Sequence, residues 1–235
     1  MFLSEQIITT DQITIYHHLG LGDHIACNGL VRHFAESAPI KLICYKKNIR
    51  NVSYMYRDNP MIDFIGVDSD GEASGIVASH TNVKRLGFIF NPSYANMMSY
   101  DRAFYAMANI DFNIRFTKFF LQRDQETEDK VYKALNPNND PYIYVHDNKA
   151  LNYVIDNKKH RNDIKVIYND MNYGMFEMGK IMENATEIHT MQTGFLDLCH
   201  SMDIKCPIYI HLYVRNYPQS HFSVCRDSNN YILVD

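Results

Sequence analysis

Short apolar runs alternate with helical patterns along most of the chain. The runs predict strands at Ile13–His17, Ile40–Tyr45, Met61–Val67, Leu86–Phe90, Tyr142–Val145, Ile164–Tyr168, Glu187–Met191, Ile208–Val214 and Tyr231–Val234. Between them, apolar residues spaced three and four apart predict helices at 25–36, Asn51–Arg57, Tyr100–Ala108, Thr127–Leu135, Phe176–Asn184 and Thr193–Met202. This alternation is typical of βαβ units with mostly parallel sheets, so the predicted fold class is α/β.

One polar segment interrupts the pattern. Asn136–Pro141 holds two prolines and three asparagines, and the strand–helix alternation restarts after it. We therefore predict two Rossmann-like halves, residues 1–136 and 141–235, that face each other across a cleft.

Composition narrows the class of protein. The 235 residues are 46% hydrophobic and 21% charged, which is typical of a globular fold rather than a disordered chain. The net charge of −4 argues against a nucleic-acid partner. The sequence has no apolar run long enough for a membrane span, and its N-terminus lacks the features of a signal peptide, so we expect a cytoplasmic protein. Its five cysteines include no C-x-x-C, which argues against a zinc ribbon.

The sharpest local motif is Leu19-Gly20-Leu21-Gly22-Asp23, between a predicted strand and a predicted helix. Glycines let a backbone approach a ligand, and a helix N-terminus favours anions such as phosphates. The same residues also fit a simple tight turn in which Asp23 caps the helix. A carboxylate at this sheet edge lies where ligands bind in open α/β folds, and there it can act as a general base.

Polar residues also follow three predicted strands of the second half. These are His146-Asp147, Asn169-Asp170 and Gln192-Thr193-Gly194. Because parallel strands end at one edge of a sheet, we expect the three groups to converge. Thr193 is the predicted cap of the following helix, where its hydroxyl and the adjacent N–H groups suit a diphosphate.

Other candidate residues carry weaker signals. Arg57 and Arg215 are candidate clamps for phosphate or carboxylate, and Glu183 is a candidate acceptor of ribose hydroxyls. The eleven histidines show no metal-binding spacing. Asp68-Ser69-Asp70 has the D-x-D pattern that holds Mg²⁺ or Mn²⁺, although acidic turns after strands are common.

The motif around Asp23 resembles the N-terminal loop of heptosyltransferase-type glycosyltransferases, which have the two-domain GT-B fold. The run Glu183-Asn184-Ala185-Thr186-Glu187-Ile188-His189-Thr190-Met191-Gln192-Thr193-Gly194-Phe195 is similar to their donor-phosphate segment, with Gln192 where the family usually has Asp. The wider chain is similar to small glycosyltransferase-like proteins of bacteria and large viruses. The pieces that carry this likeness are Met55–Asp58, Ser99–Arg102, Tyr144–Asp147, Glu183–His189 and His211–Arg215.

The resemblance implies a metal-independent, inverting glycosyltransferase that needs no cofactor besides its nucleotide-sugar donor. Asp23 then deprotonates the acceptor hydroxyl. The implied donor site comprises Gly20, Gly22, His146, Asp147, Asn169, Glu183, Gln192, Thr193, Gly194 and Arg215. The implied site for a sugar or glycan acceptor comprises Tyr56, Arg57 and Asp101.

Two other functions fit the sequence. One is a non-catalytic module that binds a nucleotide or nucleotide-sugar, which is consistent with the short chain and with Gln192. The other is a metal-dependent GT-A-type glycosyltransferase that uses Asp68 and Asp70.

Overall fold

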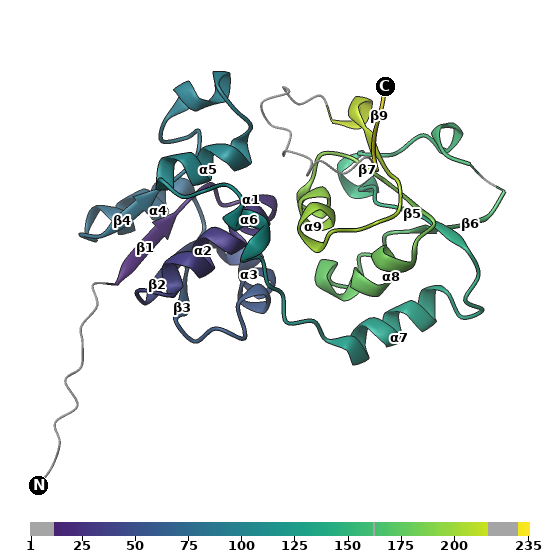
Figure 1. The fold of residues 1–235 in the computed structure, drawn as a ribbon, viewed down its shortest axis with the longest axis horizontal. Helices are drawn as coiled ribbons and strands as arrows, with labels where there is room; N and C mark the ends of the chain where they lie inside the picture. The colour runs from purple at the N-terminus through teal and green to yellow at the C-terminus, as the bar shows by residue number, and fades with distance from the viewer. Residues whose placement is uncertain (1–11, 162, 216–229) are drawn as a thin grey trace, which may run out of the picture.

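The computed structural model describes residues 12–161, 163–215 and 230–235, which fold around two parallel sheets (Figure 1). The first sheet has the order β3-β2-β1-β4. Its strands are β1 (Ile13–Tyr16), β2 (Ile40–Tyr45), β3 (Ile62–Val67) and β4 (Val83–Arg85). All its strand pairs are parallel, and β1 is buried along its whole length, as expected for a strand covered by helices on both faces.

The second sheet has the order β6-β5-β7-β8-β9, again with all pairs parallel. Its strands are β5 (Tyr142–Val145), β6 (Lys165–Tyr168), β7 (Glu187–Thr190), β8 (Ile208–His211) and β9 (Tyr231–Val234). The prediction of an α/β protein with two Rossmann-like halves is therefore confirmed.

Helices cover both sheets. The α-helices are α1 (Leu21–Ala26), α2 (Asn28–Ala35), α3 (Ile49–Met55), α4 (Asp70–Ala78), α5 (Tyr100–Ala108), α6 (Ile114–Thr117), α7 (Gln125–Leu135), α8 (Gly179–Asn184) and α9 (Gly194–Met202). Short 3₁₀ turns are η1 (Lys46–Asn48), η2 (Pro92–Asn96), η3 (Lys149–Leu151), η4 (Asn157–Lys159), η5 (Met175–Met178) and η6 (Leu212–Val214). The single helix predicted for 25–36 is two helices, because the backbone leaves helical geometry at Cys27 (φ −88°, ψ 0°).

Two sequence predictions fail in the first half. The acidic segment after β3 was predicted as a turn, but it begins helix α4. There the Ser69 side chain accepts a hydrogen bond from the Glu72 N–H at 3.2 Å, and the Glu72 carboxylate accepts one from the Asp68 N–H at 2.7 Å. This exchange resembles a capping box. The fourth strand ends at Arg85, before the predicted run, because Gly87 turns the chain with φ +109°.

Helix α7 packs with the second half rather than with the first, where the boundary at residue 136 would have placed it. It contacts α8 and η5, and Figure 1 shows it running beneath α8. An Asp129–Lys180 ion pair at 2.5 Å joins α7 to α8, and Val131 is buried between the elements. The crossover between the halves therefore precedes Gln125.

The halves share one hydrophobic core. Buried apolar residues of both, such as Ile25 and Leu30 in the first and Phe195 and Leu196 in the second, form a single contiguous cluster. Helices α1 and α9 pack against each other where the halves meet. Burial of apolar surface therefore holds the halves together. In the described part of the chain, no helix is both long and apolar enough to cross a membrane.

Candidate active site

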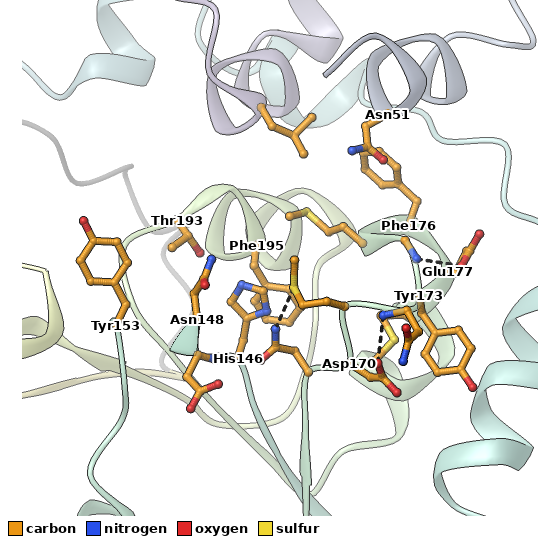
Figure 2. Close-up of a pocket in the computed structure, with 18 of the residues that line it drawn as sticks. Asn51, His146, Asn148, Tyr153, Asp170, Tyr173, Phe176, Glu177, Thr193 and Phe195 are labelled. Atoms are coloured by element: carbon orange, nitrogen blue, oxygen red, sulfur yellow. Dashed lines mark hydrogen bonds between the residues drawn. The ribbon is translucent and has the colours of Figure 1, made fainter. Parts of the chain in front are cut away.

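A cavity of about 620 Å³ lies between the halves. On the side of the second half it is bounded by the residues that follow β5, β6 and β7, as Figure 2 shows for His146, Asp170 and Thr193. On the side of the first half, η1 and α3 contribute Lys47, Arg50, Asn51 and Tyr54. The cavity therefore lies at the carboxyl edge of a parallel sheet, where open α/β folds bind ligands.

Five of the predicted donor-site residues line this cavity together: His146, Asp147, Asn169, Thr193 and Arg215. The strand-end argument accounts for the first four, since β5, β6 and β7 are parallel neighbours. The Asp147 N–H donates to Asn169 Oδ1 at 3.1 Å, which ties two of the strand ends together. The predicted convergence is thus present in the structure, and the role of these residues in donor binding remains a prediction.

His146 is a neutral, partly apolar wall of the cavity. Its ring stacks on Phe195 with 4.1 Å between centroids and 7° between planes. Burial lowers the pKa of His146 to about 4, so its imidazole is neutral near pH 7. Its Nδ1 atom is buried without a hydrogen-bond partner among the described residues. Burial also raises the pKa of the neighbouring Asp147 carboxyl.

Arg215 supports the turn that precedes α9. Its guanidinium donates to the Gln192 carbonyl oxygen at 2.6 Å and lies 5.0 Å from the centre of the Tyr153 ring. Gln192 itself is buried and does not border the cavity, so the structure does not support a direct donor contact from its side chain. Thr193 occupies the N-cap position of α9, but its hydroxyl faces the Met191 carbonyl at 3.5 Å and makes no capping hydrogen bond.

Sequence reasoning missed the wall formed by α3. The Tyr54 ring stacks on Phe176 of η5 across the two halves, with 5.6 Å between centroids and 1° between planes. The Arg57 guanidinium lies over the Tyr54 ring at 4.0 Å. Lys47 and Arg50 add positive charge to the same side of the cavity. The segment after β2 does carry polar and aromatic residues that could have indicated a binding surface. Local sequence patterns do not show that this segment faces the second half.

The three glycines predicted to hold phosphate lie outside the cavity lining. At Gly22, an added Cβ would be 3.1 Å from the Gly194 Cα, and at Gly194 it would be 3.0 Å from the Gly22 Cα. The two glycines therefore let α1 and α9 cross with their backbones in contact. At Gly20, a Cβ would lie 2.5 Å from the Asp23 carboxylate. Close backbone packing thus accounts for Gly22 and Gly194, whereas Gly20 faces only the Asp23 side chain.

Asp23 lies in the first turn of α1, close to the α1–α9 crossing but not on the cavity wall. Its side chain is 16% exposed, and its Oδ2 lies 3.2 Å from His18 Nδ1. The predicted capping role is absent: Gly20 is the N-cap of α1, and Asp23 lies within the first turn.

Burial and ion pairing contradict three further predicted ligand contacts, those of Glu183, Tyr56 and Asp101. Glu183 pairs with Arg123, which also binds the buried Glu128, so it is held against α7 away from the cavity. Tyr56 is 1% exposed and lies beneath the Arg32 guanidinium at 5.3 Å, so it cannot face an acceptor.

Asp101, the third of these residues, is fully buried in an ion pair with Arg115. Of the predicted acceptor residues, only Arg57 is exposed, and it donates to the Gln122 carbonyl at 2.7 Å.

The Asp101–Arg115 pair belongs to a buried network between the halves. Arg115 of α6 also pairs with Asp197 of α9 at 3.1 Å, and the Tyr100 hydroxyl donates to Asp197 Oδ1 at 2.6 Å. Burial raises the pKa of Asp197 to about 6, against the opposing effect of the Arg115 guanidinium. Sequence reasoning missed this network, because nothing in the local pattern marks Arg115 as buried and its partner Asp197 is distant in sequence.

The D-x-D segment is occupied by local interactions. Asp68 pairs with Lys46, while Asp70 accepts hydrogen bonds from Tyr45 at 2.8 Å and from Tyr16 at 3.2 Å. Among residues 12–161, 163–215 and 230–235, no group of three histidine, cysteine or acidic residues is arranged to hold a metal ion.

Two α/β halves, each with a parallel sheet, lie on either side of a cavity in the GT-B-type glycosyltransferase fold. Solved structures with this fold match nearly the whole chain. The glycosyl transferase family 9 protein from Veillonella parvula DSM 2008 is 13% identical, with a TM-score of 0.59 over 95% of this chain and 86% of its own.

Two further structures come from E. coli. The iron-containing dodecameric glycosyltransferase TibC of enterotoxigenic E. coli H10407 is 13% identical, with a TM-score of 0.56 over 94% of this chain and 61% of its own. The ADP-heptose lipopolysaccharide heptosyltransferase II is 11% identical, with a TM-score of 0.51 over 96% of this chain and 90% of its own. No family model and no curated protein matches the sequence.

Proposed function

We propose that this protein is a metal-independent, inverting glycosyltransferase that moves a sugar from a nucleotide-sugar to an acceptor hydroxyl. The observation that carries the proposal is the interdomain cavity of a GT-B-type fold, bordered at the carboxyl edge of the second sheet by His146, Asp147 and Thr193. Aromatic rings at Phe176 and Tyr54 suit the flat base of a nucleotide.

The charges around the cavity suit a diphosphate. Arg215 borders it from the second half, and Lys47 and Arg50 border it from the first. Positive groups fixed in place stabilise the negative charge that develops on a leaving diphosphate, without a metal ion. The acceptor oxygen attacks the anomeric carbon opposite the diphosphate, the bond to the diphosphate breaks, and the hydroxyl proton passes to the His18–Asp23 pair, whose facing atoms lie 3.2 Å apart. Attack from the opposite face inverts the anomeric centre.

The first test is a thermal-shift measurement with UDP-, GDP-, ADP- and dTDP-sugars, with and without EDTA. A ligand that binds only the folded state raises the melting temperature by mass action. We expect a rise with one nucleotide family that persists in EDTA. A rise that EDTA abolishes would instead support the metal-dependent alternative with Asp68 and Asp70, and the absence of any rise would contradict donor binding.

Matched arginine variants locate the donor. Arg50→Gln removes a positive charge from the cavity wall, whereas Arg161→Gln removes an exposed one that pairs with Asp163 outside it. We expect the first variant to weaken the donor-induced shift and the second to leave it unchanged. Equal shifts in both would place the donor elsewhere.

A second function has one specific observation in its favour. Asp23 does not line the cavity, and the backbones of Gly22 in α1 and Gly194 in α9 are in contact beside it. A module that binds a nucleotide-sugar without transferring it would tolerate this arrangement. It predicts donor-induced stabilisation without turnover, and no effect of Asp23→Asn on ligand binding.

A further inference from the structure

His18, on the loop that follows β1, pairs with the carboxylate of Asp23 in the first turn of α1. His18 Nδ1 lies 3.2 Å from Asp23 Oδ2, and the two side chains are 55% and 16% exposed. Of the two groups, the imidazole is thus the one that solvent, and any acceptor, reaches more easily.

Gly20 makes this pairing possible. Its backbone has an ordinary extended conformation (φ −67°, ψ 150°), so a turn does not require glycine here. A Cβ at this position would instead lie 2.5 Å from Asp23 Oδ2, the oxygen that faces His18. The missing side chain therefore gives the carboxylate room to fold back over the loop.

The pairing fixes which imidazole nitrogen is free to take a proton. An ionised carboxylate only accepts hydrogen bonds, so His18 Nδ1 must carry the hydrogen that points at Asp23. The lone pair then lies on Nε2, the ring nitrogen that does not face Asp23. The Asp23 carboxylate also raises the pKa of His18, with a smaller contribution from Asp70, and makes the imidazole a stronger base. The adjacent His17 and His24 are fully buried, and burial lowers the pKa of both.

We propose that His18 Nε2 is the atom that takes the proton of the acceptor hydroxyl, with Asp23 as the positioning residue that orients the imidazole. This inference rests on the proposed glycosyltransferase function. As the acceptor oxygen bonds to the anomeric carbon and the diphosphate leaves, the hydroxyl proton moves to Nε2. The Asp23 carboxylate stabilises the imidazolium and remains ionised, and the proton later passes from Nε2 to water.

The test combines activity with chemical rescue. Transfer, or hydrolysis with water as the acceptor, is measured with the donor identified by thermal shift. General-base catalysis typically contributes 10²–10⁴-fold, so we expect His18→Ala to lower kcat by about 100-fold or more. Free imidazole should restore part of the lost rate, because the missing group is an exposed base. His33→Ala, at another partly exposed histidine beside a carboxylate, should keep the wild-type rate without imidazole.

Asp23→Asn should change the pH dependence of the rate as well as the rate itself. The rate of an enzyme with a histidine base rises with pH through the pKa of that base. Without the carboxylate the His18 pKa falls, so the rising limb should move to lower pH while kcat drops. NMR titration of the histidines should show the same downward shift at His18 and none at His33.

Other outcomes would overturn the inference. A His18→Ala variant with wild-type kcat would mean that Asp23 acts alone. A folded but inactive His18→Ala variant that imidazole does not rescue would mean that the ring is structural. If the wild-type protein turns over none of the donors, the proposed function itself fails and the assignment to His18 fails with it. Activity in the wild type therefore distinguishes the two failures.

Discussion

Replacing Asp197 by Asn tests whether the buried network between the halves is stabilising. Asp197 is 2% exposed, with Arg115 3.1 Å from its Oδ1 and the Tyr100 hydroxyl 2.6 Å from the same oxygen. Asn keeps an oxygen that can accept both hydrogen bonds but carries no charge. Arg115 retains Asp101 as its ionic partner in the variant.

The sign of the effect follows from the pKa. Burial raises the pKa of Asp197 from 3.8 to about 6. When a carboxyl group holds its proton more tightly in the folded state than in the unfolded state, the free energy of unfolding falls as pH rises between the two pKa values. Each pKa unit corresponds to about 1.4 kcal/mol, so the ionised carboxylate destabilises the fold by about 3 kcal/mol above pH 6. Asn does not ionise, and we expect Asp197→Asn to be more stable than the wild type by up to that amount.

Urea unfolding at about pH 4, 5, 6 and 8 measures the difference. The advantage of Asn should grow between about pH 4 and pH 6 and stay constant above. Asp129→Asn is the matched control, because this exposed carboxylate pairs with Lys180 on the surface, and its effect should stay within about 0.5 kcal/mol. An Asp197→Asn variant that is clearly less stable than the wild type at about pH 8 would refute the reasoning, since attraction to Arg115 would then exceed the desolvation penalty.

Three further changes test other parts of the structure. Arg115→Met leaves two buried carboxylates without their shared cation and should lower the free energy of unfolding by about 3–5 kcal/mol in urea; an unchanged value would contradict the network. Gly194→Ala places a Cβ 3.0 Å from the Gly22 Cα and should lower the free energy of unfolding by about 1–3 kcal/mol, whereas Gly75→Ala, with open space around its Cβ, should raise it by up to about 1 kcal/mol. His146→Phe should keep the stack on Phe195 and the melting temperature but weaken the donor-induced thermal shift, because the ring loses its polar Nδ1; an undiminished shift would exclude a contact from that nitrogen.

Most of the fold could be predicted from hydrophobic periodicity. The predicted strands Ile40–Tyr45 and Tyr142–Val145 and the helix Tyr100–Ala108 match the structure residue for residue. Helix α4 was missed because its first residues carry turn signals, and side-chain capping at Ser69 decides that they begin a helix. The placement of α7 was missed because sequence order says nothing about which half buries an amphipathic face.

Some residues of the candidate site could also be predicted from the sequence, and others could not. Residues at the carboxyl ends of parallel strands, such as His146 and Thr193, were predictable because sheet topology brings such ends together. Tyr56 and Asp101 were misplaced because a motif specifies residue types, whereas tertiary packing determines whether they are buried. The α3 wall was missed because contact between the halves has no local signature in the sequence.

The contact between Gly22 and Gly194 limits where a donor can bind in the proposed reaction. Leu21 and Thr193 border the cavity, whereas Gly22 and Gly194 beside them contact each other. A diphosphate does not fit between two backbones in van der Waals contact, so a bound donor must lie on the cavity side. Asp23 does not line that side, and under the proposed mechanism donor and base meet only when α1 and α9 separate. The Arg115–Asp197 ion pair joins the halves beside this crossing. Arg115→Met should therefore lower the free energy of unfolding, because two buried carboxylates lose their shared cation, and raise the turnover rate, because the halves separate more easily.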